Sequence, residues 1–122
     1  MQHQDVIISS IETHCQALSN NDKSAWLEIW AKDAVIEDPV GVSTYRGLEE
    51  ISTALWSEIA AISPMKLWLV EEIIVCGNEA IAILAADVKS GWGRRKVGPI
   101  VDHFVFNNEA IISQMRAFWK VE

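Results

Sequence analysis

Hydrophobic positions recur with helical spacing in three stretches of the N-terminal half. From residue 6 to 18 they predict an amphipathic helix with one buried face, formed by Ile7, Ile8, Ile11, Cys15 and Leu18. A polar segment then ends this helix and caps a second one, whose buried side is formed by Trp26, Leu27, Ile29 and Trp30. A third helix is predicted from residue 48 to 62, where Ser63-Pro64 ends it.

The pattern changes to strands elsewhere. A short strand at residues 34–38 precedes the third helix, and four strands follow it at residues 66–76, 80–88, 96–106 and 110–119. The run 80–88 is apolar throughout, which predicts a strand covered on both faces. This order predicts an α+β fold, in which a curved antiparallel sheet wraps on the helices and leaves a pocket between them.

Length and charge narrow the class of protein. The 122 residues are half hydrophobic, which fits one compact domain over residues 1–122 with a substantial core. A formal net charge of −7 makes nucleic acid a poor partner. The chain shows no signal-peptide pattern and no apolar run long enough to span a membrane. We therefore expect a cytoplasmic protein with neither nucleic acid nor membrane as a partner.

Cysteines and short motifs indicate no cofactor. Cys15 and Cys76 lack metal or redox spacing, so we expect both to be small buried residues in a reducing compartment. The sequence contains no metal-ligand spacing, phosphate loop or nucleophile elbow, so neither a cofactor nor a metal is expected. The basic run Arg94-Arg95-Lys96 follows Gly91-Trp92-Gly93 and indicates a solvated hairpin tip, with an anion site as the alternative.

Asp38 is the first candidate functional residue. Alternation along its strand places Ile36 and Asp38 on one face, and Val35 and Glu37 on the other. Pro39 holds Asp38 extended and ends the strand. A carboxylate turned toward the interior loses hydration, which makes it a stronger base where a proton donor lies opposite. The alternative is that Asp38 only opens a turn.

Asp102 is the second candidate. Alternation places it on one face of its strand with Ile100, Phe104 and Phe106, and places His103 on the other. Desolvation on the apolar face favours the neutral acid, which can donate a hydrogen bond to an oxyanion. The alternative is that Asp102 braces a neighbouring backbone group. For His103 we expect a structural or subunit-contact role.

His14 is the third candidate. It lies three positions after Ile11 and four before Leu18, on the apolar edge of the first helix. A lone histidine in such a place is more often a core residue with a satisfied hydrogen bond than a catalyst, so both interpretations stay open.

Three motifs make the chain resemble bacterial ketosteroid isomerases over nearly its whole length. They are Glu-Asp-Pro-Val-Gly within residues 34–41, Asp-His-Phe within residues 99–106, and Met-Arg-Ala within residues 113–119, in that order. These enzymes belong to the nuclear-transport-factor-2-like superfamily, which also includes polyketide-cyclase-like proteins. The resemblance implies a cone-shaped α+β fold with three N-terminal helices, a homodimer through the outer sheet face, and isomerisation of a 3-oxo-steroid without cofactor or metal.

The resemblance also implies roles for single residues. Asp38 matches the general base, and Asp102 matches the protonated acid of the oxyanion hole, which is a known case of a carboxylic acid kept neutral in this family. The family's oxyanion-hole tyrosine falls at His14, whose neutral N–H can donate in its place. Apolar residues expected to bind the substrate are Leu18, Leu55, Leu84, Phe104, Met115 and Trp119.

Three functions are consistent with these residues. The first is proton transfer, in which Asp38 removes a proton next to the ketone of a flat, steroid-like molecule while Asp102 and His14 stabilise the enolate. The second is a polyketide-cyclase-like or hydrolytic activity that uses an Asp–His pair in the same pocket. The third is a non-catalytic dimer that binds a small apolar ligand.

Overall fold

The structure, a computed structural model, describes residues 3–121 and confirms the α+β fold class. Its helical segments are α1 (His3–Ser19), α2 (Lys23–Leu27), α3 (Gly47–Glu50), the π-helical η1 (Ile51–Leu55) and α4 (Trp56–Ala61). Its strands are β1 (Trp30–Glu37), β2 (Thr44–Arg46), β3 (Lys66–Leu69), β4 (Ile74–Cys76), β5 (Glu79–Ser90), β6 (Gly93–Phe106) and β7 (Ile112–Phe118). Segments α3, η1 and α4 follow one another directly and together form the third predicted helix.

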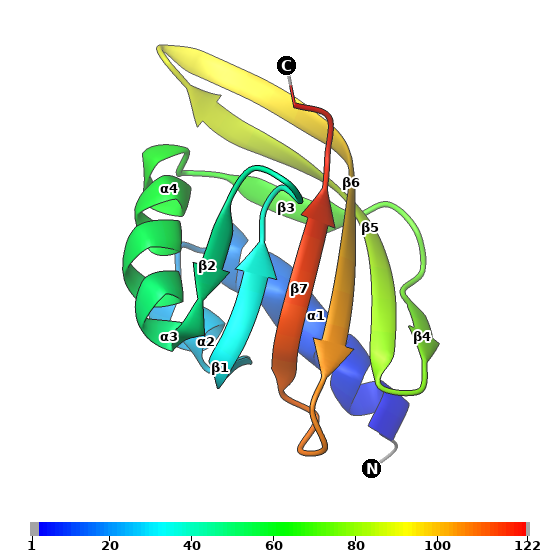
Figure 1. The fold of residues 1–122 in the computed structure, drawn as a ribbon. Helices are drawn as coiled ribbons and strands as arrows, with labels where there is room; N and C mark the ends of the chain where they lie inside the picture. Colours follow the sequence, from blue (N-terminus) through cyan, green and yellow to red (C-terminus); the bar gives the residue numbers. More distant parts are fainter. Residues whose placement is uncertain (1–2, 122) are drawn as a thin grey trace.

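The strands form one curved sheet of seven strands (Figure 1). Its order is β2-β1-β7-β6-β5-β3, and β4 pairs with a second part of β5. All pairs are antiparallel except β1 with β7, which is parallel. The prediction of a wholly antiparallel sheet is therefore wrong for this pair. A parallel pair needs a long crossover, and the segment from β2 to β6 supplies it.

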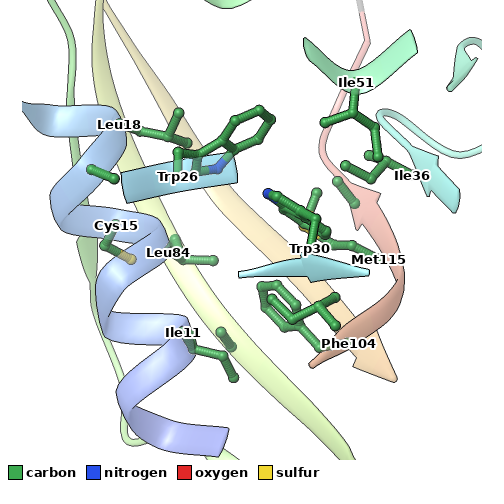
Figure 2. Close-up of a cluster of buried hydrophobic side chains, with 14 of the residues drawn as sticks. Ile11, Cys15, Leu18, Trp26, Trp30, Ile36, Ile51, Leu84, Phe104 and Met115 are labelled. Atoms are coloured by element: carbon green, nitrogen blue, oxygen red, sulfur yellow. The ribbon is translucent and has the colours of Figure 1, made fainter. Parts of the chain in front are cut away.

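The core lies between α1 and one face of the sheet (Figure 1). Figure 2 shows Ile11 on α1 facing the sheet, with Leu84 and Phe104 nearby. Burial of each large apolar side chain contributes about 1.5–3 kcal/mol. The largest fully buried side chains are Trp26, Phe104, Phe106, Ile7, Ile11, Ile36, Ile51, Leu84 and Ile112. Within residues 3–121 no helix is long and apolar enough to cross a membrane.

The second helix is shorter than the sequence predicts. It ends at Leu27, and Trp30 begins β1 instead of completing the helix. Pairing with β7 overrides the helical spacing, because the Ile112 N–H donates to the Ile29 carbonyl at 3.1 Å and Trp30 lies opposite Ile112. Trp26 and Trp30 still meet edge to face, with their ring centroids 5.4 Å apart.

Two strand predictions are also corrected, and one strand, β2, was not predicted. The predicted strand 66–76 is two strands, β3 and β4, which pair with different parts of β5, and Cys76 is exposed. Strand β2 is only three residues long, too short to show an alternating pattern. Strand β5 is buried on one face only, because Ile81 and Ile83 on its other face are partly exposed.

Candidate active site

A cavity of about 530 Å³ lies between the helices and the inner face of the sheet. This volume is within the range of small-molecule sites, about 300–1,000 Å³. Asp38, Asp102 and His14 all lie on its wall, although they come from the end of β1, from β6 and from α1. The wall is otherwise mostly apolar and includes Leu18, Trp26, Leu55, Ile59, Met65, Val88, Val97, Ile100, Met115 and Trp119.

Asp38 follows β1 directly and begins a closed turn. Its backbone N–H donates to the Ser43 carbonyl at 3.0 Å, and the Val40 N–H donates to the Ala117 carbonyl of β7 at 2.9 Å. The faces of β1 follow the predicted alternation, since Ile36 is fully buried and Glu37 forms an ion pair with Arg116 at 3.1 Å. The strand end and the turn together place Asp38 on the cavity wall.

One oxygen of the Asp38 carboxylate accepts a hydrogen bond from a neighbouring side chain. The indole N–H of Trp119 donates to Asp38 Oδ1 at 2.9 Å. The pKa of Asp38 is raised from 3.8 to about 6, and the main cause is burial. The Trp119 hydrogen bond and proximity to His14 lower this pKa, whereas proximity to Asp102 raises it. Asp38 is therefore more basic than a surface carboxylate but still ionised near neutral pH. Because Trp119 occupies Oδ1, Oδ2 is the oxygen left to face a ligand.

Asp102 and His14 form a buried pair at the cavity wall. The cross-strand neighbours of Asp102 are Ala82 on β5 and Ala117 on β7, and these small side chains leave space beside its carboxyl. His14 Nε2 lies 3.6 Å from Asp102 Oδ2, and each residue is 3% exposed. That distance is too long for a direct hydrogen bond, so both groups remain available to a ligand oxygen.

Trp26 sets the tautomer of His14. Its indole N–H donates to His14 Nδ1 at 3.0 Å. Because an indole nitrogen only donates, Nδ1 is the acceptor, and the neutral imidazole carries its hydrogen on Nε2, the atom nearest Asp102. The sequence indicated only a core role for Trp26, since no spacing pattern relates residues on two different helices.

The predicted substrate-binding residues divide into two groups. Leu18, Leu55, Met115 and Trp119 line the cavity. Among the described residues Leu84 and Phe104 are fully buried and are not part of the wall. In Figure 2 Leu84 lies against α1, which covers that part of the sheet. Phe104 packs edge-on against His14, with ring centroids 5.6 Å apart. Both therefore support the wall from behind.

Other titratable and polar residues complete the site. Burial, followed by the proximity of Asp102 and Glu12, raises the pKa of the Cys15 thiol to about 12, so this thiol is not a nucleophile near neutral pH. Residues 3–121 contain no group of three or more His, Cys, Asp or Glu side chains arranged to hold a metal. Tyr45 and Arg95 also line the cavity, and sequence reasoning assigned neither to the pocket.

Comparison with known proteins finds one matching family profile and several solved structures with the same fold. A family profile described as SnoaL-like domain matches residues 11–114. Three solved structures share the fold at low sequence identity. RV0760c from Mycobacterium tuberculosis in complex with estradiol-17beta-hemisuccinate has a TM-score of 0.83 and 24% identity, with 95% of each chain covered.

The other two structures are described as enzymes. The epoxide hydrolase/cyclase-like enzyme SalBIII, with a role in pyran ring formation in the polyether salinomycin, has a TM-score of 0.85 and 24% identity, covering 99% of this chain and 95% of that one. An M. tuberculosis LEH-like epoxide hydrolase has a TM-score of 0.81 and 19% identity, covering 95% of this chain and 84% of that one. At these identities the likeness shows the fold alone.

Proposed function

The chain belongs to the SnoaL-like family, and on this basis we propose that it is an enzyme that moves a proton next to a ketone without a cofactor. The proposed reaction shifts the double bond of a 3-oxo-steroid or of a similarly flat, apolar ketone. The observation that carries this proposal is that a carboxylate with a pKa of about 6 lies on the wall of one apolar cavity together with the buried Asp102 carboxyl group and the His14 imidazole.

The proposed steps use three side chains. Asp38 Oδ2 takes a proton from the carbon between the ketone and the double bond, and the electron pair of that C–H bond moves to form an enolate. The enolate oxygen accepts hydrogen bonds from the Nε2–H of His14 and from the acid form of Asp102, which is the role that the resemblance to ketosteroid isomerases implies for this residue. Asp38 then returns its proton to the far carbon of the former double bond, which gives the conjugated ketone and restores the carboxylate.

The proposal is tested by absorbance at the wavelength of the conjugated enone, with a non-conjugated 3-oxo-steroid as substrate. We expect turnover by the wild-type protein well above the buffer rate. A protein that binds the steroid without converting it would contradict the isomerase and favour the non-catalytic binding protein.

A second candidate is epoxide opening, either by water or by a hydroxyl of the same molecule. It is favoured by the buried Asp102–His14 pair beside a basic carboxylate, an arrangement able to protonate an epoxide oxygen while Asp38 activates the nucleophile. The names of SalBIII and the LEH-like hydrolase point in the same direction. Formation of a diol from an epoxide by this chain, with no steroid conversion, would replace the isomerase by this activity.

The pH dependence of kcat/KM follows from the state of Asp38. Because the base must be ionised, kcat/KM should fall about tenfold per pH unit below a midpoint near 6. Trp119→Phe removes a hydrogen bond that lowers the pKa of Asp38, so the midpoint should move to higher pH. The matched control is Trp92→Phe at the exposed hairpin tip. A midpoint that stays in place or falls in Trp119→Phe would contradict the role of this bond.

We further propose a homodimer through the outer face of β5 and β6. Ile81, Ile83, Val101 and Val105 lie there, partly exposed, on the face opposite the cavity. His103 joins this face and contacts Glu79, with 2.6 Å between Nε2 and Oε1. Sedimentation equilibrium should give twice the 13.7 kDa chain mass, and Val101→Glu should give one chain. A wild-type monomer would contradict the dimer.

A further inference from the structure

The β5–β6 hairpin forms the rim of the cavity. Figure 1 shows its two strands extending past α4. The backbone N–H of Lys89 donates to the Ile62 carbonyl at 2.9 Å, and the Arg94 guanidinium donates to the Pro64 carbonyl at 2.6 Å. These bonds tie the hairpin to the segment that follows α4. Residues on the inner face of the hairpin therefore close the outer end of the cavity.

Strand register turns Arg95 toward the cavity. Arg95 lies directly opposite Val88, and Val97 lies directly opposite Ala86. Residues that face each other across a ladder share one side of the sheet, and all four of these residues line the cavity. Lys96, the next residue along β6, therefore points to the outer side.

Arg95 carries a charge without a counter-charge. It forms no ion pair with any of residues 3–121, whereas Arg94 pairs with Asp87 at 2.9 Å. The hairpin residues 88–97 include Lys89, Arg94, Arg95 and Lys96 and no acidic residue, in a chain whose net charge is −7. Of these, Lys89 and Arg95 line the cavity, where Glu58 of α4 is also part of the wall, so the hairpin brings two positive charges to the cavity against the one negative charge of Glu58.

Distance separates this charge from the reacting groups. Along β6 the segment from Arg95 to Asp102 spans at most about 23 Å at about 3.3 Å per residue. The wall between them is apolar and includes Val97 and Ile100. A ligand that reaches both ends must therefore carry an apolar body between two polar groups.

We propose that Arg95 binds an anionic group, such as a carboxylate or a sulfate or phosphate ester, at the end of the ligand remote from the ketone. The guanidinium presents paired donors that match these groups. This inference rests on the proposed function, which orients the ketone of the ligand toward Asp102. It implies that the ligand of the cavity is an amphipathic anion and not a neutral steroid.

Binding of two esters of one conjugated 3-oxo-steroid tests this inference without turnover. The 17β-hemisuccinate carries a carboxylate, and the 17β-acetate is neutral; the fluorescence of Trp26 and Trp119 on the cavity wall reports binding of either. Wild-type protein should prefer the hemisuccinate, and Arg95→Gln should weaken hemisuccinate binding about 3- to 5-fold, as expected for one solvent-accessible ion pair. Acetate binding should not change.

Lys96→Gln is the matched control, because it removes one positive charge from the adjacent residue on the outer side. It should leave the hemisuccinate preference in place, and salt near 0.5 M should remove that preference in the wild type. Equal effects of Arg95→Gln on both esters, or equal effects of the two variants on the hemisuccinate, would overturn the subsite.

A second pair of ligands, the anion dodecanoate and the neutral dodecanol, repeats the binding comparison without a steroid skeleton. A preference for dodecanoate that depends on Arg95, without steroid binding, would support the anionic subsite while removing the steroid from the proposed function. Absence of an Arg95-dependent preference in both ligand pairs would overturn the subsite, whatever the enone assay shows.

Discussion

Asp38→Asn is expected to lower kcat by about 10²–10⁴-fold, the usual contribution of a general base. The amide has the shape of the carboxylate, and its oxygen can still accept the Trp119 N–H, but it does not accept a proton at neutral pH. Affinity for a conjugated ketone should therefore be nearly unchanged. The rate of enone formation gives kcat, and quenching of tryptophan fluorescence gives the affinity.

Asp33→Asn is the matched control for this variant. Asp33 is exposed on β1, the strand that Asp38 follows, so the change in net charge and in side-chain shape is the same. It should keep full turnover. Wild-type turnover by Asp38→Asn would remove Asp38 from the mechanism, and an equal loss in both variants would indicate a general effect of charge.

Asp102→Leu is expected to lower kcat by about 10²–10³-fold, the usual effect of removing one donor to an oxyanion. Leucine is similar in size and suits the apolar neighbours Ala82 and Ala117, so the fold should persist. Asp102→Asn should lose less, because its amide N–H can still donate. Steady-state kinetics give kcat, and thermal unfolding checks the fold. If Asp102 only braces the backbone, Asp102→Leu will lower stability and leave kcat unchanged.

Local periodicity was sufficient to predict the fold class and the faces that carry the three titratable residues. Two-residue alternation places Asp38 beside Ile36 and places Asp102 beside Phe104, and helical spacing places His14 on the buried edge of α1. Each of these is a property of one element and its neighbours in sequence, and the structure brings the three residues to one cavity.

Local periodicity does not predict contacts between elements that are far apart in the sequence. The bond from Trp119 to Asp38 joins residues 81 positions apart, and the bond from Trp26 to His14 joins two helices. Pairing of β1 with β7 likewise moved Trp30 from a helix to a strand. The resemblance to ketosteroid isomerases placed Leu84 at the cavity, but a resemblance in sequence does not give the depth of a side chain, and Leu84 is fully buried in the core.

Removal of a proton next to a ketone by Asp38 is the central claim, and the fate of a deuterium label tests it most directly. Both hydrogens of the carbon between the ketone and the double bond of a non-conjugated 3-oxo-steroid are replaced by deuterium, and NMR follows the label at that carbon. We expect wild-type protein to remove one of the two deuterium atoms, and Asp38→Asn to do so no faster than buffer. Retention of both deuterium atoms with wild-type protein, or removal of one at the wild-type rate by Asp38→Asn, would contradict the claim.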